Sequence, residues 1–372
     1  MRTLAVVGGG VIGLSVAWRA AESGWTVTLL DPAQGTGASW VAGGMLAPLS
    51  EGWPGEDGAL EFGAASLARW PDFAARLRAR TGADLFTATR TLTVALDAAD
   101  AADLRTIADW VNARGHALQL LDRAGVRAAE PGLARTVRAG LLATSEPAVD
   151  NRALVTALHE ASLAAGVEFR AEQVTALENL PHDRIVLAAG AAAAALWPGL
   201  PVRPVKGEIL RLRRRPSAPV PPQGVIRARV HGRPIYLVPR ADGIVLGATQ
   251  YEQGFDTAVT VAGVRDLITD AEAILPGIGE YEFAEAAAGS RPGSPDSVPL
   301  IGYLDNRVIA ATGHGRNGIL GTPVTADAVL ALLADTELPE AAPADPGRFA
   351  RTVLADIRPA RTDAPISPGG IR

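Results

Sequence analysis

The chain has 372 residues, 48% of them hydrophobic and 20% charged, a composition typical of a globular protein rather than a disordered one. The formal net charge of −5 argues against nucleic-acid binding, and no apolar run reaches the roughly 18 residues of a membrane span. Because cysteine is absent and the five histidines are never spaced i, i+4, the sequence excludes disulfides, iron–sulfur clusters and cysteine nucleophiles and predicts no metal site.

The amino terminus has the pattern of a β-α-β unit. An apolar strand over residues 4–7 leads into the glycine-rich turn 8–13, which reads G-x-G-x-x-G. Helical periodicity follows over 14–23, and a second apolar strand over 27–30 ends at Asp31. A secretory signal would not carry this glycine spacing, so we predict a dinucleotide-binding unit.

Each conspicuous residue of this unit has a physical task. Gly8 permits the tight turn, Gly10 lets the backbone approach a pyrophosphate, and Gly13 lets helix and strand pack closely. The helix amino terminus offers N–H groups to the phosphates, and Asp31 is placed to accept hydrogen bonds from ribose hydroxyls. The alternative is a merely structural glycine turn. The pattern does not separate NAD from FAD, although its position at the amino terminus favours FAD. The predicted contacts are Gly8, Gly10, Val11, Ile12, Gly13 and Asp31.

A second glycine-rich segment, residues 37–48, follows soon after Asp31. Its composition predicts an irregular chain that approaches a flat or charged group closely. Ser39 could hydrogen-bond a phosphate while the backbone after it passes a flavin ring, and the alternative is an ordinary surface loop. The candidate contacts here are Ala38, Ser39, Gly43, Gly44 and Met45.

A third such turn lies near the carboxyl end. A strand over 307–311 precedes the turn 312–323, with Thr322 as the predicted N-cap and Pro323 as the first residue of an apolar helix over 324–333. The helix amino terminus could face the N1/C2 carbonyl edge of a flavin. There it would stabilise the negative charge of the reduced ring.

These segments together resemble a known family. The GGMLAP run after the first glycine turn and the GH-x-RNGIL run before the last helix are similar to the D-amino-acid oxidase-like FAD-dependent oxidoreductases, and most similar to the glycine oxidases of thiamine biosynthesis. The resemblance covers residues 3–335. It implies an α/β fold in which a Rossmann-type FAD-binding domain is interleaved with an α+β substrate domain built on a large antiparallel sheet. Because the chain has no cysteine, FAD could be bound noncovalently or linked through histidine, and we expect noncovalent binding.

The resemblance implies further cofactor contacts. Val174, within a strand-like stretch over 167–177, is expected to contact the adenine, and the apolar strand and turn over 185–190 return to the dinucleotide. These segments and the third glycine turn contribute Val174, Ala189, Gly190, Gly313, His314, Gly315, Arg316, Asn317, Gly318, Ile319 and Leu320.

The same resemblance implies the substrate-binding residues. Residues 235–249 are predicted to form a hairpin with its turn at 241–243. The resemblance implies that Tyr236 in this hairpin is a pocket wall and hydrogen-bond donor, although its strand pattern alone favours a core position. Arg291 in the S-R-P-G run becomes a bidentate clamp for a carboxylate rather than a surface ion pair. Arg316 either orients the substrate or supports the reduced flavin. Gln250 departs from an apolar family position and predicts a more polar pocket.

We assign residues 1–83, 147–203 and 290–340 to the FAD-binding domain and 84–146 and 204–289 to the substrate domain. The proline- and arginine-rich stretch 213–222 is expected to be a loop between strands. Residues 341–372 form a carboxyl-terminal tail in which 348–357 could be a short helix and the chain beyond 358 is expected to be disordered.

The expected reaction is oxidative deamination of glycine or another small amino acid or amine, by hydride transfer to the flavin. It would give an imine, then glyoxylate and ammonia, with dioxygen converted to hydrogen peroxide, unless a thiazole-forming partner captures the imine. The alternatives are a D-amino-acid or sarcosine dehydrogenase with a non-oxygen acceptor, and a flavin-binding protein without catalysis. By resemblance we expect a homotetramer, and because no believable signal or membrane span is found in the sequence we expect a cytoplasmic location.

Overall fold

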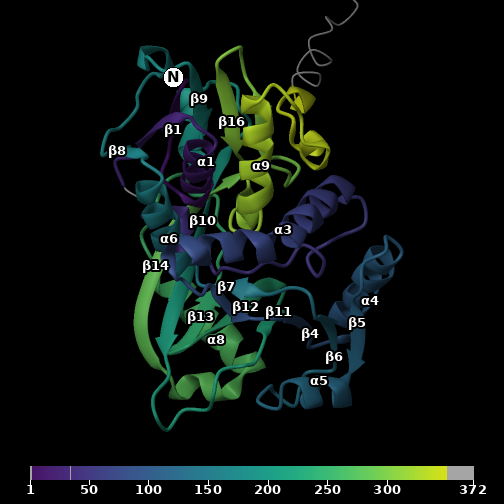
Figure 1. Ribbon diagram of the computed structural model, residues 1–372. Coiled ribbons are helices and arrows are strands. Elements are labelled where there is room, and N and C mark those ends of the chain that lie inside the picture. The colour runs from purple at the N-terminus through teal and green to yellow at the C-terminus, as the bar shows by residue number, and fades with distance from the viewer. Residues whose placement is uncertain (1, 34, 350–372) are drawn as a thin grey trace, which may run out of the picture.

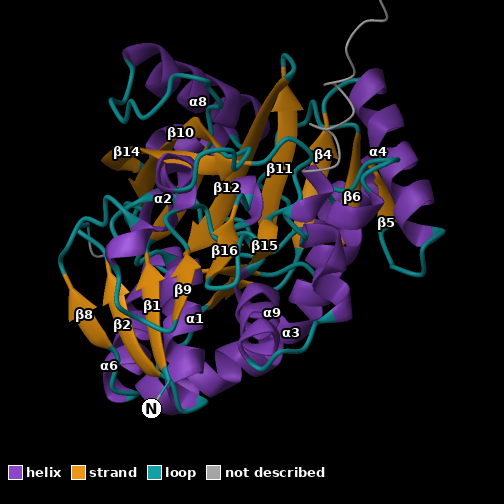
Figure 2. Ribbon diagram, turned by 90° about the horizontal axis from the view of Figure 1, so that it is seen from above, coloured by secondary structure: helices purple, strands orange, loops and turns teal. Residues whose placement is uncertain are grey.

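The computed structural model describes residues 2–33 and 35–349, and it has two main sheets in an α/β arrangement (Figure 1). Within these residues the first sheet has six strands, all parallel except the antiparallel edge strand β15. In spatial order they are β15 (Leu300–Tyr303), β16 (Val308–Thr312), β9 (Arg184–Leu187), β1 (Thr3–Val7), β2 (Thr26–Leu30) and β8 (Glu168–Arg170). Figure 2 shows β8, β2, β1 and β9 side by side.

The parallel sheet exists because its strands are apolar on both faces. Leu4 and Val6 of β1 pack against helices on one side, whereas Ala5 and Val7 pack against an apolar cluster on the other. The helices that cover the first face are α1 (Val11–Glu22), α3 (Asp57–Thr81), α6 (Asn151–Ala164) and α9 (Thr322–Leu333). This confirms the β-α-β unit predicted at the amino terminus.

The second sheet has eight strands among the described residues. In order they are β14 (Glu282–Gly293), β10 (Arg203–Arg213), β13 (Gly243–Gly247), β12 (Arg233–Arg240), β11 (Val225–Val230), β4 (Thr91–Ala95), β6 (Ala139–Ala143) and β5 (Gln119–Asp122). All neighbours are antiparallel except β11 and β4. The predicted hairpin is present as β12 and β13, and the predicted loop lies between β10 and β11.

Helix α8 (Val261–Ile274) covers part of this second sheet. It packs against β10 and β12 through Leu267, Ala271 and Ile274, which join the apolar cluster of the sheet. The remaining α-helices among the described residues are α2 (Ala38–Val41), α4 (Ala98–Asn112), α5 (Arg123–Ala129) and α7 (Ala193–Leu196). The short strands β3 (Phe86–Ala88) and β7 (Ala148–Val149) pair with each other.

The chain passes repeatedly between the two sheets. Strands of the first come from residues 3–30, 168–187 and 300–312, and strands of the second from 91–143 and 203–293. We propose the two-domain division given above on this basis, with one adjustment. The boundary at 290 falls inside β14, which continues to Gly293 as part of the second sheet.

Three local predictions were wrong. The segment expected to be irregular contains helix α2, and the strand expected over 167–177 is limited to β8. Thr322 is the first residue of α9 rather than its N-cap, which is Gly321. The Thr322 hydroxyl donates to the Gly318 carbonyl at 3.0 Å and caps no N–H group of the helix. The predictions for the tail beyond residue 349 fall outside the described residues.

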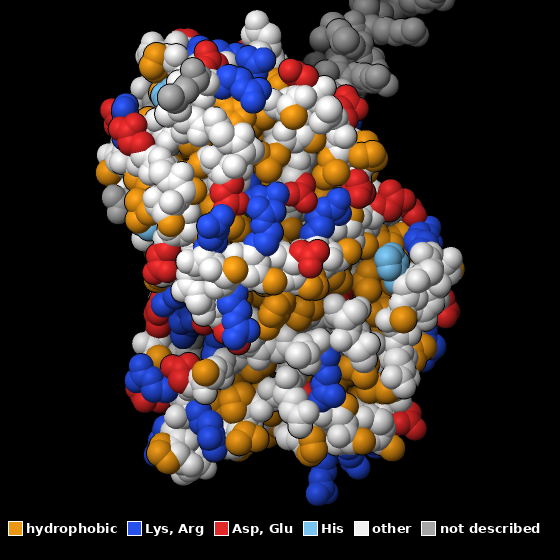
Figure 3. Space-filling model, viewed as in Figure 1, with side chains coloured by type: hydrophobic (Ala, Val, Ile, Leu, Met, Phe, Trp, Pro, Cys, Tyr) orange, Lys and Arg blue, Asp and Glu red, His pale blue; other side chains and the backbone are white. Residues whose placement is uncertain are grey.

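Helix α3 crosses the molecule at the level where the two sheets meet (Figure 1). In Figure 3, basic and acidic side chains lie next to one another along this band. Ion pairs join Arg69 to Asp327 of α9 at 3.2 Å and Arg76 to Glu22 of α1 at 2.9 Å. Helix α3 is thereby fixed against the helices of the parallel sheet.

Candidate active site

The glycine-rich turn between β1 and α1 leaves its backbone uncovered. Gly8 has a φ of +109°, which only glycine adopts readily, and a Cβ there would overlap the Ala188 carbonyl. A Cβ on Gly13 would overlap the carbonyl of Gly8. The turn therefore requires glycine at both positions, and it places the amino terminus of α1 where a pyrophosphate can approach.

Asp31 and Ser39 lie on either side of this turn. The Asp31 carboxylate accepts hydrogen bonds from the N–H groups of Gly9 at 3.0 Å and Gly35 at 2.9 Å. The Ser39 hydroxyl accepts one from the N–H of Val11, the first residue of α1, at 3.1 Å. The predicted ribose and phosphate residues are thus brought together at the carboxyl ends of β1 and β2, as a dinucleotide requires.

A cavity of about 240 Å³ adjoins these residues, between the sheet edge and helix α6. Its lining combines aliphatic, aromatic and polar or charged side chains with one glycine, and includes Gly9, Asp31, Trp40, His159, Phe169 and Arg170. The imidazole of His159 lies against the Phe169 ring, with 4.4 Å between ring centroids. The cavity provides space directly beside the carboxylate that is predicted to bind ribose.

Asn151, the first residue of α6, holds the segment that carries Ser39. Its side-chain NH₂ donates to the carbonyls of Ser39 and Trp40, both at 2.9 Å. Its side-chain oxygen accepts from the guanidinium groups of Arg211 at 3.1 Å and Arg240 at 3.4 Å. Asn151 therefore connects α2 to two strands of the second sheet.

Arg240 extends this connection to the predicted flavin-facing glycines. It is buried, and its guanidinium donates to the Gly43 carbonyl at 2.9 Å. Burial lowers the pKa of Arg240 to about 10, so it remains charged at neutral pH. A charged buried donor fixes the carbonyl of Gly43, next to the ring of Tyr236.

Tyr236 and Arg291 converge on one face of the second sheet, although two strands, β10 and β13, lie between the strands that carry them. A Cβ on Gly247 of β13 would lie 2.5 Å from the Tyr236 ring, and a Cβ on Gly207 of β10 would overlap the Arg291 guanidinium. The two glycines therefore leave room for the side chains to lie across the intervening strands. Arg291 also donates to the Thr249 carbonyl at 3.3 Å.

The hydroxyl of Tyr236 is suited to donate a hydrogen bond. Burial raises its pKa above the ordinary value, although Arg291, which is hydrogen-bonded to it, and Arg240 pull the pKa down. The phenol stays protonated at neutral pH. Arg291 and Tyr236 thus present a guanidinium and a neutral hydroxyl side by side.

Glu51 is a buried carboxylate that faces this pair. It bonds to Arg227 of β11 at 3.0 Å and to Arg316 of the 3₁₀ turn η4 (Gly315–Asn317). Burial alone would raise the pKa of Glu51, but Arg227, Arg316 and Arg291 outweigh it and hold the pKa below its ordinary value. Three guanidinium groups around one carboxylate leave an excess of positive charge, which favours a negatively charged group such as a carboxylate.

Gln250 and Val174 lie less centrally than predicted. The Gln250 side chain is exposed, in the segment that follows β13. Val174 packs against the apolar cluster on the outer face of the parallel sheet, after the end of β8. By contrast, Ala189 and Gly190 follow β9 directly, and Ala189 lies against Gly8.

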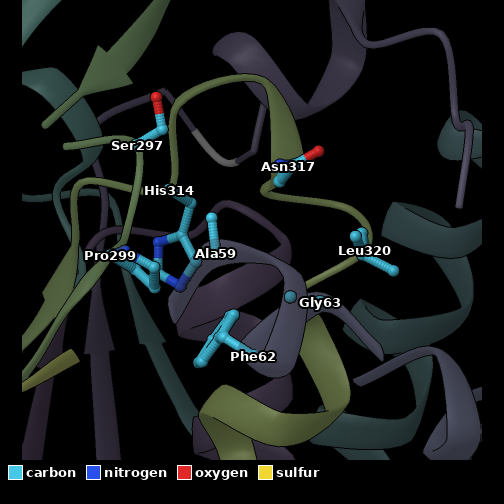
Figure 4. A pocket seen from close by; sticks show the side chains of 9 residues that line it. Ala59, Phe62, Gly63, Ser297, Pro299, His314, Asn317 and Leu320 are labelled. Atoms are coloured by element: carbon cyan, nitrogen blue, oxygen red, sulfur yellow. The ribbon is translucent and has the colours of Figure 1, made fainter. Parts of the chain in front are cut away.

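The His314 side chain is buried against helices α3 and α9. Figure 4 shows its imidazole between Pro299 and Ala59, above Phe62, where the residues line a cavity of about 10 Å³. The ring is hydrogen-bonded to the Thr325 hydroxyl at 2.9 Å, and burial lowers the pKa of His314 to about 3. The imidazole is neutral, and a cofactor contact at this position falls to the backbone.

The 313–320 turn that carries Arg316 is fixed from outside. The Ser66 hydroxyl and the Trp70 indole of α3 both donate to the Leu320 carbonyl, at 2.6 and 2.9 Å. A bridge between Gly293 and His314 joins the end of β14 to this turn. Arg291 and Arg316 are therefore held on adjoining segments.

Sequence reasoning missed Glu51, Arg227, Asn151 and the two strand glycines. Glycine inside a strand pattern signals a close approach, and Gly207 and Gly247 carried that signal. Asn151 stands one residue after an N-cap aspartate, so it reads as an ordinary helix start. Nothing in the sequence pairs Glu51 with Arg227, which is 176 positions away. Separately, none of the described helices is long and apolar enough to cross a bilayer.

Comparison with known proteins agrees with this geometry. A family model described as FAD dependent oxidoreductase (DAO) matches residues 3–332. The chain is 32% identical to the bifunctional protein ThiO/ThiG of Synechocystis sp., and the match covers 98% of this chain and 56% of that protein. This chain therefore spans about half the length of such bifunctional relatives. It is 30% identical to a glycine oxidase of Geobacillus kaustophilus, covering 87% of this chain and 90% of that one.

The crystal structure of glycine oxidase from Geobacillus kaustophilus superposes with a TM-score of 0.86 at 29% identity, covering 93% of this chain and 98% of that chain. The open glycine turn, Asp31 after β2, and Ser39 of α2, whose hydroxyl accepts from the N–H that starts α1, form an arrangement compatible with a dinucleotide such as FAD. The chain therefore belongs to the DAO family of FAD-dependent oxidoreductases, with FAD as its cofactor.

Proposed function

We propose that the protein oxidises glycine or another small amino acid or amine to the corresponding imine. The observation that carries this proposal is the convergence of Tyr236 and Arg291 over Gly247 and Gly207, on the face of the sheet that also meets Gly43. A guanidinium suits a carboxylate, and a neutral phenol beside it can donate to the same group. The names of the glycine oxidase relatives support this assignment.

The residues of this chain supply binding and orientation. Arg291 would hold the substrate carboxylate and Tyr236 would orient it, while Glu51 keeps Arg227 and Arg316 in place around them. Gly8, Gly10, Gly13, Asp31 and Ser39 would hold the cofactor noncovalently. FAD, when bound, supplies the hydride acceptor and passes the electrons to dioxygen, which becomes hydrogen peroxide.

The product is an imine that water hydrolyses to glyoxylate and ammonia when glycine is the substrate. We propose that a thiazole-forming partner of thiamine biosynthesis can capture this imine. Two names support the proposal: ThiO is joined to ThiG in the Synechocystis relative, and a Rhizobium etli relative, 33% identical, is named as a candidate thiamine biosynthesis oxidoreductase, ThiO.

The test is an anaerobic visible spectrum of the purified holoprotein with and without glycine, followed by air and peroxide detection. We expect glycine to bleach the flavin absorbance and air to restore it with formation of peroxide. Bleaching only by sarcosine or a D-amino acid would identify that compound, and not glycine, as the substrate. Bleaching without recovery in air would indicate another electron acceptor, and a spectrum that no amine alters would refute the proposed function.

Arg291→Ala tests the role of the guanidinium. Loss of a charged hydrogen-bonding partner costs about 1.5–3 kcal/mol, so we expect KM to rise roughly 10- to 150-fold. Arg291→Lys keeps the charge but not the planar fork, so its KM should lie between those of the wild type and Arg291→Ala. Unchanged KM in Arg291→Ala would remove Arg291 from the proposed site.

A further inference from the structure

Lys206 is the one lysine of the chain, and its side chain is completely buried. It lies on β10 between Val205 and Gly207, so it points to the opposite face of the sheet from Gly207 and Arg291. Leu210, on the same face as Lys206, packs with the residues of α8. Lys206 therefore lies behind the proposed substrate site and not in it.

The ammonium of Lys206 is paired with a segment that follows the site. It donates to the Asp256 carboxylate at 2.6 Å and to the Gln253 side-chain oxygen at 3.4 Å, and it lies 3.6 Å from the carboxylate of Glu208. Asp256 and Gln253 belong to residues 249–260, which connect β13 to α8. A buried ammonium is tolerated only when it is paired, so its burial depends on docking of this segment.

Lys206 and Glu208 fasten this segment at both ends. The backbones of Lys206 and Tyr251 exchange two hydrogen bonds, at 2.9 and 3.0 Å. The backbone N–H of Glu208 donates to the Thr249 hydroxyl at 2.9 Å, and the Glu208 carboxylate accepts from the N–H of Thr260 at 2.9 Å. Two residues of β10 thus determine where the 249–260 segment starts, turns and ends.

The segment is in turn joined to the substrate site. Its first residue, Thr249, offers its carbonyl to the guanidinium of Arg291 at 3.3 Å, and Gln250 follows. A shift of the segment would therefore move a direct hydrogen-bond partner of Arg291. The remaining residues from Gln250 to Thr257 are largely exposed, so packing alone does not fix them.

We propose that Lys206 is a positioning residue: by holding Asp256 it docks the 249–260 segment against β10 and so fixes the orientation of Arg291 across the sheet. The effect on turnover rests on the proposed function. The docking itself does not, and a single lysine in the chain allows it to be measured chemically.

The first experiment follows acetylation of Lys206 by an N-hydroxysuccinimide ester in the holoprotein, measured by peptide mass spectrometry so that the amino terminus is counted separately. Asp256→Ala removes the partner at a half-exposed surface position, outside the apolar core. We expect labelling of Lys206 to rise at least tenfold in this variant and to fall back in Asp256→Glu. Equal labelling in wild type and Asp256→Ala would refute the docking.

Glu252→Ala is the matched control. Glu252 lies in the same segment and pairs with Arg203 at the surface, where both side chains are about two-thirds exposed. The Glu252→Ala substitution removes one carboxylate of the segment and leaves the partners of Lys206 unchanged. We expect wild-type labelling and wild-type kinetics, and an equal rise in labelling in both variants would mean that general loosening, not the Lys206–Asp256 pair, is measured.

The second experiment asks whether docking reaches Arg291. We expect Asp256→Ala to raise the KM for glycine at least fivefold with kcat changed less than twofold, and to raise by a similar factor the Kd of acetate, followed by its perturbation of the flavin spectrum. Increased labelling with unchanged KM and acetate affinity would refute the link to the site. If wild type responds to no amine, the proposed function fails, while the labelling and acetate measurements still decide this inference.

Discussion

At the scale of single residues, the space above Gly247 decides where Tyr236 lies. A methyl group there would lie 2.5 Å from the ring, which must move. Displacement of a substrate-orienting group by about 1 Å costs on the order of 100-fold in rate, so we expect Gly247→Ala to lower kcat/KM for glycine by about that factor. Steady-state kinetics on the FAD-loaded variant measures this.

Gly132→Ala provides the comparison for this prediction. Its added methyl would meet only Leu275, at an ordinary contact distance of 3.5 Å. We expect near wild-type kinetics from this variant. If Gly247→Ala were equally active, the ring of Tyr236 would not need its observed position.

Glu146 predicts a pH dependence of stability. Its carboxyl group is buried, accepts hydrogen bonds from the N–H groups of Leu49 and Ser50 on one oxygen, and has no partner for the other. Burial raises the pKa of Glu146 to about 7. At a pH below the ordinary pKa of a glutamate, the carboxyl group is protonated in both the native and the unfolded state. As the pH rises to 7 the unfolded chain ionises first, so the native state loses about 3 kcal/mol of relative stability.

Glu146→Gln removes this titration while keeping an oxygen for the two N–H groups. The free energy of unfolding of the variant, relative to wild type, should therefore increase by about 3 kcal/mol between pH 4.5 and 7.5 and then level off. Denaturant unfolding at a series of pH values measures the difference. A difference independent of pH would show that burial does not raise the pKa of Glu146 above its value in the unfolded chain.

The sequence identifies residues best where function depends on a contiguous motif. Arg291 and Arg316 stood in such motifs, and the structure places both around Glu51. Glu51 and Arg227 could not be predicted, because an ion pair between two loops or strands leaves no periodic trace in either segment. The direction of the His314 ring was equally hidden, since its motif fixes the backbone turn and not the rotamer.

At the scale of elements, α2 depends on α6 for its position. Asn151 is hydrogen-bonded to two carbonyls of α2 and to two guanidinium groups of the second sheet. Loss of the Asn151 side chain would free α2. This helix contains Ser39, whose hydroxyl accepts a hydrogen bond from the N–H of Val11 at the start of α1. Because each of the two neutral bonds to α2 contributes about 0.5–1.5 kcal/mol, we expect their joint loss in Asn151→Ala to raise the Kd of FAD roughly tenfold.

Fluorescence titration of the apoprotein with FAD measures this change. Asn112→Ala is the matched variant, since Asn112 also makes two backbone hydrogen bonds, to Leu118, but at the end of α4. We expect it to lower stability and to leave the Kd of FAD unchanged. Equal losses of FAD affinity in both variants would point to a general destabilisation.

Element prediction succeeded where periodicity was long and failed where it was short. The strands and helix of the amino-terminal unit have clear apolar patterns, and the structure confirms them within a few residues. The stretch 167–177 is also rich in apolar residues, but only the three residues Glu168, Phe169 and Arg170 pair with β2, and one of these is apolar. Strand pairing, which is a tertiary property, decided the extent of β8.

At the scale of the whole molecule, the two sheets are joined by side chains rather than by one continuous core. Arg240 reaches from β12 to Gly43, and Arg152 of α6 forms a two-point ion pair with Glu285 of β14 at 2.9 and 2.6 Å. The chain alternates between the sheets, so neither sheet is assembled from one stretch of sequence. Composition and motifs predicted two domains, but only three-dimensional pairing shows how they meet.

This arrangement predicts that FAD stabilises the entire native state. The proposed cofactor contacts come from Gly8–Gly13, from the α2 segment and from the turn that carries Arg316, and these segments come together only in the folded chain. A ligand that binds the native state alone stabilises it by about 2.7 kcal/mol at 100 times its Kd. Removal of FAD should lower the unfolding temperature in a single transition, and addition of FAD should raise it progressively with concentration.

Calorimetry of the apoprotein at 1, 10 and 100 times the Kd of FAD measures this linkage. Riboflavin is the control, because it lacks the pyrophosphate that the amino terminus of α1 would bind. At the same concentrations it should stabilise far less. Two transitions, of which FAD moves only one, would mean that the parallel sheet binds the cofactor as an independent unit and that the Arg240 and Arg152 contacts do not couple the two sheets.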